Sequence, residues 1–298
     1  MSRDEGPSGL LVVDKPAGPT SHDVVARVRR LAGTRRVGHA GTLDPAATGV
    51  LVIGVGKATK LLGHLALADK DYLATVRLGA STVTDDAQGE DLGGASTAGL
   101  TEAAVRAGVA ALTGDLLQVP SAVSAVKVDG VRSYARVRSG EHVELAARPV
   151  RVDAFEVLAL RRPGPDVLDV DVAVTCSTGT YVRALARDLG AALAVGGHLV
   201  SLRRTRVGGF GLSAARTLDE LADHFELVPL ALAVQAQFPR LDVDSAAAEL
   251  VGHGRGLPLD GLGLAAGPVG VFGPEGEVMA LMAERDGLLR PLVVFAPR

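Results

Sequence analysis

A single carboxylate stands in a glycine-framed turn near the start of the chain, and such a turn can present a catalytic acid. The carboxylate belongs to Asp44, within the run VGHAGTLDPAATGV at residues 37–50. Gly41 and Gly49 allow backbone angles that other residues resist, and Pro45 fixes one torsion. A strand-like apolar run follows, so the turn can hold its side chain at the end of a sheet, where catalytic groups tend to sit. The local alternative is an Asp that only starts a turn, because Asp-Pro is a common turn starter.

Further motifs around this turn favour catalysis. An opening Lys-Pro segment precedes it, and a tyrosine-bearing strand, a central segment and two arginine-containing segments follow, at residues 9–21, 70–79, 118–130, 176–183 and 202–205. In kind and order these blocks resemble the TruB family of tRNA pseudouridine synthases. The essential residue of that family is the Asp of Gly-Thr-Leu-Asp-Pro, so the resemblance implies that Asp44 is catalytic. One departure is Ser121-Ala122-Val123, where the family has a bulkier stretch.

The resemblance implies the isomerisation of uridine to pseudouridine, with the T-loop uridine at tRNA position 55 as substrate. This reaction breaks the bond from C1′ of the ribose to N1 of the uracil, and the rotated base rejoins through C5. No redox step occurs, so we expect no organic cofactor. The single cysteine and the absence of an HExxH spacing among the seven histidines give no reason to expect a metal. The chemistry needs a carboxylate that acts as nucleophile or base, a cation that keeps it ionised, and a surface that holds the loosened base.

Individual positions receive these roles from their match to the family motifs. Arg183 matches the Arg of a Tyr-x-Arg motif and is expected to pair with Asp44. Tyr72 matches the tyrosine that stacks on the uracil, and it is the candidate for moving the proton from C5. Three more matches are expected to bind substrate. Tyr181 is expected to pack beside the base and Leu202 to line the pocket. His39 is expected to hold the RNA loop with its base extruded.

Arginines near the motifs are candidate phosphate ligands. Arginine supplies 26 of the 31 basic residues, and its guanidinium suits bidentate phosphate contacts. The candidates flank the catalytic turn and Leu202: Arg29, Arg30, Arg35, Arg36, Arg203, Arg204 and Arg206. Two alternatives stay open, namely a solvated charged face without RNA and a high arginine content that reflects codon bias.

Composition limits the classes of protein that fit. With 298 residues and 47% hydrophobic content, the chain is long enough for a large domain plus a small one. The net charge of -3 excludes a globally basic nucleic-acid binder, and residues 240–298 carry 5 basic and 8 acidic side chains. Any RNA-binding potential must therefore be local.

Cysteine content and hydropathy give an expectation about location. Cys176 is the only cysteine, so an internal disulfide and a Cys-based zinc site are excluded, and we expect a buried, inert thiol. The N-terminus shows no apolar signal core, and no window offers about 18 uninterrupted apolar residues. We expect a cytoplasmic monomer without an obligate protein partner, with the tRNA T stem-loop as its partner.

Hydrophobic periodicity predicts an α+β fold. The expected class is a pseudouridine-synthase-like catalytic domain, whose mixed, mostly antiparallel sheet is flanked by helices, followed by a small C-terminal β domain that resembles a PUA module. A flexible tail at 1–8 precedes the catalytic domain at 9–236, and the β domain occupies 240–298. Expected strands lie at 10–13, 51–55, 72–78, 148–160, 167–176, 269–272, 277–282 and 292–295. Expected helices lie at 24–31, 100–112, 180–194 and from 217, and residues 81–97 read as an exposed excursion.

Two short patterns are set aside. The run GVGKAT at residues 54–59 suggests a phosphate loop, but Leu51 stands where the first glycine belongs and Ala58 where Ser or Thr belongs. The run Ser-His-Asp at residues 21–23 suggests a hydrolase triad, but helix capping explains it better. Two functional alternatives stay open: a pseudouridine synthase for another RNA site, and an RNA chaperone that folds tRNA without chemistry.

Overall fold

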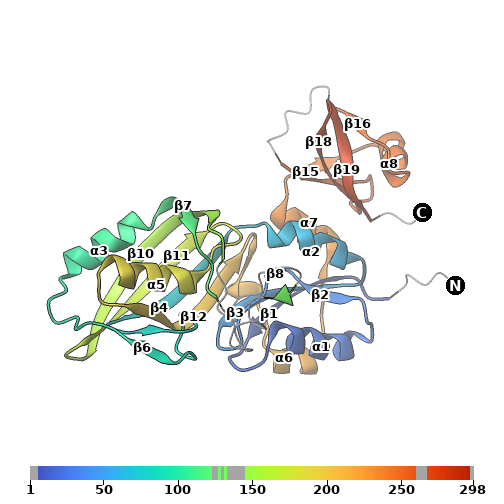
Figure 1. Ribbon diagram of the computed structural model, residues 1–298. Coiled ribbons are helices and arrows are strands. Elements are labelled where there is room, and N and C mark those ends of the chain that lie inside the picture. Colours follow the sequence, from blue (N-terminus) through green and yellow to red (C-terminus); the bar gives the residue numbers. More distant parts are fainter. Residues whose placement is uncertain (1–5, 123–126, 129–130, 133–144, 260–266, 296–298) are drawn as a thin grey trace. The chain divides into compact units, whose positions relative to one another are not determined.

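The computed structural model describes residues 6–122, 127–128, 131–132, 145–259 and 267–295 (Figure 1). The chain folds into two compact units. The first contains residues 1–45, 49–66 and 207–298, and the second contains residues 46–48 and 67–206. Within the central motif, positions 123–126 and 129–130 lie outside the described residues, as do positions 1–5 of the expected tail.

The first unit is built on two strands that are buried on both faces. β1 (Gly9–Lys15) pairs antiparallel with β3 (Thr48–Val55), and their apolar runs place hydrophobic side chains on alternate faces. β2 (Val37–His39) pairs with β3, and β14 (Val228–Pro229) pairs with β1. Helices cover both sides of these strands (Figure 1): α1 (Ser21–Ala32), α6 (Leu218–Asp223), α2 (Leu62–Ala66) and α7 (Leu230–Gln237), with the 3-10 helix η1 (Gly56–Leu61).

The helix α1 forms where the sequence predicts it, because its ends carry clear signals. Thr20 caps its first turn, and its hydroxyl accepts a hydrogen bond from the backbone N–H of Asp23 while the Asp23 carboxylate accepts one from the Thr20 N–H. Gly33 ends the helix with a φ of 62°, in the left-handed region that favours glycine. The Asp of the set-aside triad is therefore a capping residue, as predicted.

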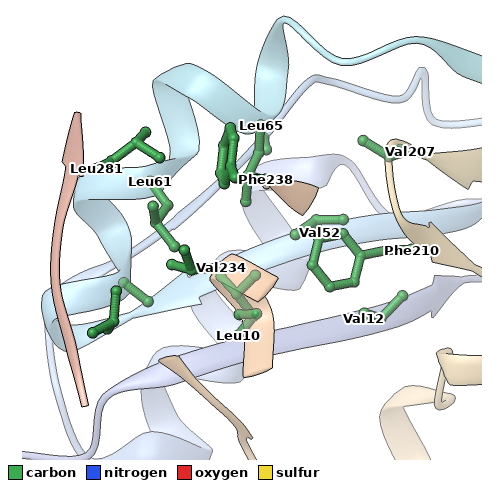
Figure 2. Packing of buried hydrophobic residues seen from close by; sticks show 14 of the residues in the cluster. Leu10, Val12, Val52, Leu61, Leu65, Val207, Phe210, Val234, Phe238 and Leu281 are labelled. Atoms are coloured by element: carbon green, nitrogen blue, oxygen red, sulfur yellow. The ribbon is translucent and has the colours of Figure 1, made fainter. Parts of the chain in front are cut away.

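A hydrophobic core joins the N-terminal strands to the C-terminal part of the first unit (Figure 2). Leu10 and Val52 pack from β1 and β3, and Leu61 packs from η1. Val234 of α7 and Leu281 of β18 (Val278–Arg285) join the cluster from the C-terminal part. Burial of each such side chain stabilises the fold by roughly 1.5–3 kcal/mol, so this cluster anchors the β domain to the strands that carry the Asp44 turn.

The C-terminal part of the predicted fold is confirmed as a small β structure. Its strand order is β15-β17-β18-β19-β16, with β15 (Arg240–Asp242) and β17 (Val269–Phe272) parallel and the other pairs antiparallel. β19 spans Leu288–Val294 and β16 spans Leu257–Pro258. The helix α8 (Ser245–Gly252), which the sequence analysis did not predict, packs Val251 into the core of this sheet.

The second unit is an antiparallel sheet with helices against it, as predicted. The strand β11 (Val167–Cys176) lies between β4 (Lys70–Leu78) and β10 (Arg148–Gly164), and β7 (Gly114–Gln118) continues the sheet beyond β10. The helices α3 (Glu102–Ala111) and α5 (Val182–Ala192) pack against the strands (Figure 1). Cross-strand ion pairs, such as Arg77 Nε to Asp169 at 2.7 Å, mark the more polar positions of the strands.

Three features of the second unit go beyond the predictions. Residues 81–97 are largely exposed, as predicted, but they also contain the short strands β5 (Ser81–Thr82) and β6 (Asp91–Gly93), and Asp85 is buried. The predicted helix at 180–194 is confirmed as α5, which begins at Val182, and Ser177 before it accepts a hydrogen bond from the Arg151 backbone N–H at the end of the hairpin. The strand β12 (Gly197–Val207), which lies beside β4, is absent from the prediction because its arginines hide the alternation.

The single cysteine behaves as expected. Cys176 is buried, and burial raises the pKa of its thiol to about 11. In the described part of the chain, no helix combines the length and the apolar character needed to cross a membrane. Lys70, at the start of β4, is also buried, and it donates to the carbonyl of Ala68 at 2.7 Å.

The buried lysine makes stability depend on alkaline pH. Burial, reinforced by the charge of Arg204, lowers the pKa of Lys70 from 10.5 to about 8. Between these two values the unfolded chain holds the proton and the folded chain does not, so stability rises with pH in that window. Relative to Lys70→Met, the wild-type free energy of unfolding should gain about 3 kcal/mol across this window.

Urea unfolding at a series of pH values measures this gain. Lys60→Met is the matched control, because Lys60 is exposed. The difference in free energy of unfolding between the wild type and Lys60→Met should not change with pH. A constant difference between wild type and Lys70→Met over the same range would contradict the assignment.

Candidate active site

The turn that carries Asp44 is fixed on its N-terminal side by a buried serine. Ser21 Oγ donates to the carbonyl of Leu43 at 3.0 Å and accepts from the Leu43 N–H at 2.9 Å. Ser21 is 1% exposed, so this double bond is shielded from water. The residue directly before Asp44 is therefore held at both of its backbone polar groups.

The same turn is fixed on its C-terminal side by the opening Lys-Pro segment. The carbonyl of Pro45 accepts from Lys15 Nζ at 3.0 Å and from the Gly18 N–H at 2.8 Å. Lys15 is fully buried, and its ammonium also donates to the carbonyl of Pro16 at 2.9 Å. Asp44 itself is half-buried, and the backbone on both sides of it is held in place.

Two glycines make the turn possible. Gly41 and Gly49 have φ angles of 94° and 97°, in the region that other residues avoid. His39 lies at the end of β2, half-buried, with its ring edge-on to that of His22 at a centroid distance of 5.5 Å. Residues 46–48, directly after the turn, belong to the second unit, where Arg203 Nη1 donates to Thr48 Oγ1 at 3.4 Å.

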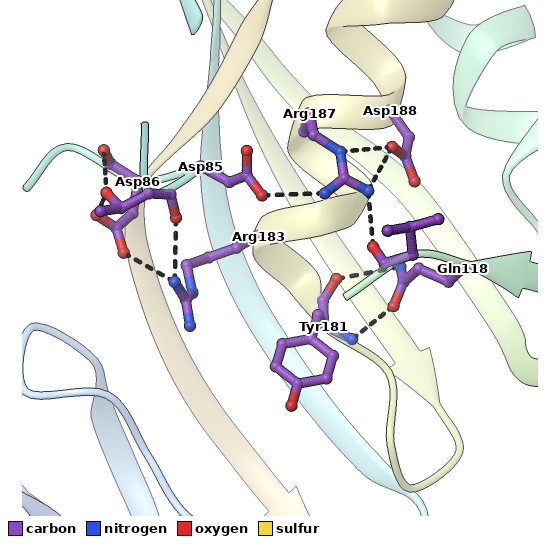
Figure 3. A network of polar contacts seen from close by, with 9 residues as sticks. Asp85, Asp86, Gln118, Tyr181, Arg183, Arg187 and Asp188 are labelled. Atoms are coloured by element: carbon purple, nitrogen blue, oxygen red, sulfur yellow. Dashed lines mark hydrogen bonds and ion pairs between the residues drawn. The ribbon is translucent and has the colours of Figure 1, made fainter. Parts of the chain in front are cut away.

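Arg183 is a buried cation with a defined orientation in the second unit (Figure 3). It stands in the first turn of α5 and is 6% exposed. Its Nη1 donates to the carbonyl of Thr84 at 3.0 Å and lies 3.5 Å from the carboxylate of Asp86. A buried guanidinium needs such partners, because an unpaired charge in the interior is costly.

Tyr181 is held through its backbone rather than its ring (Figure 3). It is the N-cap residue of α5, and its N–H donates to Gln118 Oε1 at 2.8 Å. Gln118 Nε2 donates in turn to the Tyr181 carbonyl at 3.2 Å. The ring points away from Gln118, so the aromatic face is not used by this contact.

Arg187, one turn after Arg183, ties three segments together. It contacts the carboxylates of Asp85 at 3.1 Å and Asp188 at 2.8 Å, and it donates to the carbonyl of Val119 at 2.8 Å. Asp85 has a φ of 59°, which is unusual outside glycine. Burial raises the pKa of Asp85, against the opposing charges of Arg187 and Arg183. This network keeps the 84–86 turn in place beside α5.

The remaining predicted residues lie on strands of the second unit. Tyr72 is 8% exposed on β4, opposite Val174, and Leu202 is half-buried on β12. Arg203 is half-buried, whereas Arg204 is 1% exposed. Of the two arginines, Arg203 is therefore the better candidate for an RNA phosphate. Arg206 is engaged by Asp71 in a bidentate pair.

Sequence reasoning missed three residues of this site: Ser21, Asp86 and Gln118. From its sequence Ser21 reads only as a helix-capping residue, and Asp86 lies in the segment expected to be exposed. Gln118 belongs to the central motif at 118–130, which gives it no individual role. Their functions depend on partners 22 to 97 positions away in the chain, as in the Arg183–Asp86 pair, so no local signal reveals them.

Asp44 belongs to the first unit, whereas Arg183, Tyr72 and Tyr181 belong to the second. Within each unit the structure supplies a prepared group: a carboxylate on a clamped turn in one, and a buried, paired guanidinium beside a backbone-held tyrosine in the other. In the described ranges, no group of three or more His, Cys, Asp or Glu side chains is placed to hold a metal ion.

Comparison with known proteins covers nearly the whole chain. Residues 29–182 match the model described as TruB family pseudouridylate synthase, N-terminal domain. Residues 183–229 match the tRNA pseudouridylate synthase B C-terminal domain, and residues 238–296 match the model of tRNA pseudouridine synthase II, C terminal.

Similar proteins agree with these matches. The chain is 58% identical to tRNA pseudouridine synthase B of Streptomyces griseus subsp. griseus, over 97% of this chain and 98% of that protein. It is 60% identical to the protein of the same name from Thermobifida fusca, over 97% and 98%. Among solved structures, a Cbf5-Nop10-Gar1 complex matches with a TM-score of 0.75 and 28% identity, over 97% of this chain and 85% of that one.

The family expectation raised by the sequence motifs is thereby confirmed. The matching models together span residues 29–229 and 238–296, and the relatives are similar in length to this chain. The chain belongs to the TruB family and is a pseudouridine synthase.

Proposed function

We propose that this protein isomerises uridine to pseudouridine at position 55 in the T loop of tRNA. The observation that carries the proposal is the position of Asp44 in a clamped turn, whose two neighbouring residues are both hydrogen-bonded to the opening motif. The relatives named tRNA pseudouridine synthase B, at 58–60% identity, support tRNA as the substrate class.

Asp44 is the nucleophile or base that opens the reaction, and Arg183 is its cationic partner. A carboxylate on a fixed turn samples fewer positions, which lowers the barrier by reducing the entropy cost of alignment with the substrate. The Thr84 carbonyl and the Asp86 carboxylate hold the guanidinium in place through its Nη1. Arg183 then stabilises the ionised form of Asp44 when the substrate is bound.

The tyrosines handle the base. Tyr72 stacks on the extruded uracil and moves the proton from C5, and Tyr181 packs beside it with Leu202. Stacking on an aromatic ring contributes roughly 1–3 kcal/mol per base, which offsets the cost of extruding a loop nucleotide. His39, Arg203 and the exposed Arg29 and Arg30 hold the loop and its phosphates.

We further propose that the chain acts as a monomer in the cytoplasm. The buried lone cysteine suits a reducing compartment. Light scattering of the purified chain, with and without tRNA, measures the stoichiometry, and a stable dimer in both samples would contradict the monomer.

Replacement of Asp44 by Asn should abolish isomerisation while the affinity for tRNA changes little. The amide keeps the size and hydrogen-bonding shape but cannot serve as nucleophile or base. Unmodified tRNA is incubated with each protein, pseudouridine is mapped by position, and the dissociation constant is measured in parallel. Retained pseudouridine formation by Asp44→Asn at position 55 would refute the role of Asp44.

The same variant separates catalysis from chaperoning. Folding of a misfolded tRNA is compared between wild type and Asp44→Asn. If only folding is observed and no pseudouridine forms with the wild type, the chain is an RNA chaperone rather than an active synthase. A product at another RNA position would identify a different substrate site.

Removal of the Ser21 hydroxyl should slow the reaction more than it weakens tRNA binding. Ser21→Ala leaves both backbone groups of Leu43 unpaired in a buried site, so the turn loses its fixed geometry. We expect a single-turnover rate lower by about tenfold or more, in line with the sensitivity of catalysis to small displacements. Ser8→Ala is a control outside the turn, and an unchanged rate in Ser21→Ala would show that the clamp is dispensable.

A further inference from the structure

We propose that Gln118 is a positioning residue for the reaction, because its amide fixes the peptide from which α5 starts. The inference rests on the proposed function, since the groups that Gln118 controls are Tyr181 and, two residues later, Arg183. Gln118 lies at the end of β7, 63 positions before Tyr181, and it is 3% exposed.

The contact uses the whole side-chain amide. Oε1 accepts from the Tyr181 N–H at 2.8 Å, and Nε2 donates to the Tyr181 carbonyl at 3.2 Å (Figure 3). This exchange of two bonds has the pattern of a hydrogen-bonded pair in an antiparallel sheet, with a side chain in place of one strand. A buried amide is costly unless both of its polar ends are satisfied, and here they are satisfied by one residue.

The start of α5 lacks the usual stabilising features of a helix N-terminus. Its N-cap residue makes no side-chain capping bond, and its first turn contains no acidic residue. The Tyr181 carbonyl also accepts from the Leu185 N–H at 3.1 Å, which is the first hydrogen bond of the helix. Gln118 therefore sets the orientation of the peptide group on which the helical ladder of α5 begins.

A second tie lies one turn further along the helix. Arg187 donates to the carbonyl of Val119, the residue after Gln118, at 2.8 Å. Residues 118 and 119 thus hold α5 at Tyr181 and at Arg187, and Arg183 lies between these two contact points. A rotation of the first turn would draw the guanidinium of Arg183 away from the Thr84 carbonyl and Asp86. Displacements of about 1 Å cost catalysis heavily, so the clamp acts on the rate rather than on affinity.

The variant Gln118→Glu tests the donor half of the clamp by its pH dependence. The ionised carboxylate still accepts from the Tyr181 N–H, but it places an oxygen against the Tyr181 carbonyl. Once protonated, the carboxyl donates to that carbonyl and restores both bonds. Burial raises the pKa of the introduced carboxyl above its usual value of about 4.3, which brings the transition into a range where activity is measurable.

The measurement is the single-turnover rate of pseudouridine formation on unmodified tRNA, together with the tRNA dissociation constant, from pH of about 5.5 to about 8.5. We expect Gln118→Glu to be slower than wild type by about tenfold at the alkaline end, with unchanged affinity. The ratio of the two rates should approach one as the pH falls. A merely structural role would give a ratio that does not change with pH.

Two further variants complete the design. Gln118→Met keeps the length of the side chain without either bond, and it should show a rate defect with the same ratio to wild type at every pH. Gln237→Glu is the matched control: the Gln237 amide accepts from the Gly209 N–H at 2.8 Å in the first unit, and this variant should keep the wild-type rate. Circular dichroism and thermal melts establish that each variant is folded.

The outcomes separate the two proposals. Wild-type protein that forms no pseudouridine at position 55 refutes the proposed function. Active wild type with wild-type rates in Gln118→Glu and Gln118→Met overturns the positioning role alone, as does a loss of affinity without a loss of rate. If Gln118→Glu does not fold, Gln118→Met decides: a lower rate with unchanged affinity supports the clamp, and an unchanged rate overturns it.

Discussion

The buried guanidinium of Arg183 is the constraint on which the second unit depends. A cation with 6% exposure is stable only where partners replace its hydration, and the chain supplies the Thr84 carbonyl and the Asp86 carboxylate. Those partners lie on a turn that is itself anchored to α5, because Arg187 contacts Asp85 from the next helical turn. The turn and the helix therefore define each other, and neither can shift without unpairing a buried charge.

The first unit applies the same logic to a single turn. Backbone groups on both sides of Asp44 are bonded to residues of the opening motif, and the strands beneath are buried on both faces. Rigid support is needed here because a carboxylate that samples many orientations loses the advantage of prior alignment. The two halves of the proposed catalytic pair are thus prepared differently: contacts to the neighbouring backbone fix the turn of Asp44, whereas the Arg183 guanidinium is itself held by the Thr84 carbonyl and Asp86.

Local signals account for the parts of the fold that the sequence predicted. The Thr20 capping box, the left-handed Gly33 and the alternation along β4 specify their elements without distant partners. The family motifs named Asp44, Arg183 and the tyrosines, but not what holds them. Asp86 escaped prediction because its segment is rich in turn residues, and its ion-pair partner lies on a helix almost 100 positions away. Gln118 escaped because a glutamine on a strand is ordinarily exposed.

The central claim is that the Asp44 carboxylate acts on an extruded uridine with the Arg183 guanidinium beside it. The decisive experiment is a crystal structure of this protein bound to an unmodified T stem-loop with a non-reactive nucleotide at the target position. We expect an Asp44 oxygen within about 4 Å of a guanidinium nitrogen of Arg183, with the carboxylate facing the extruded nucleoside. A complex in which Asp44 faces away from the nucleotide and Arg183 pairs only with Asp86 would contradict it.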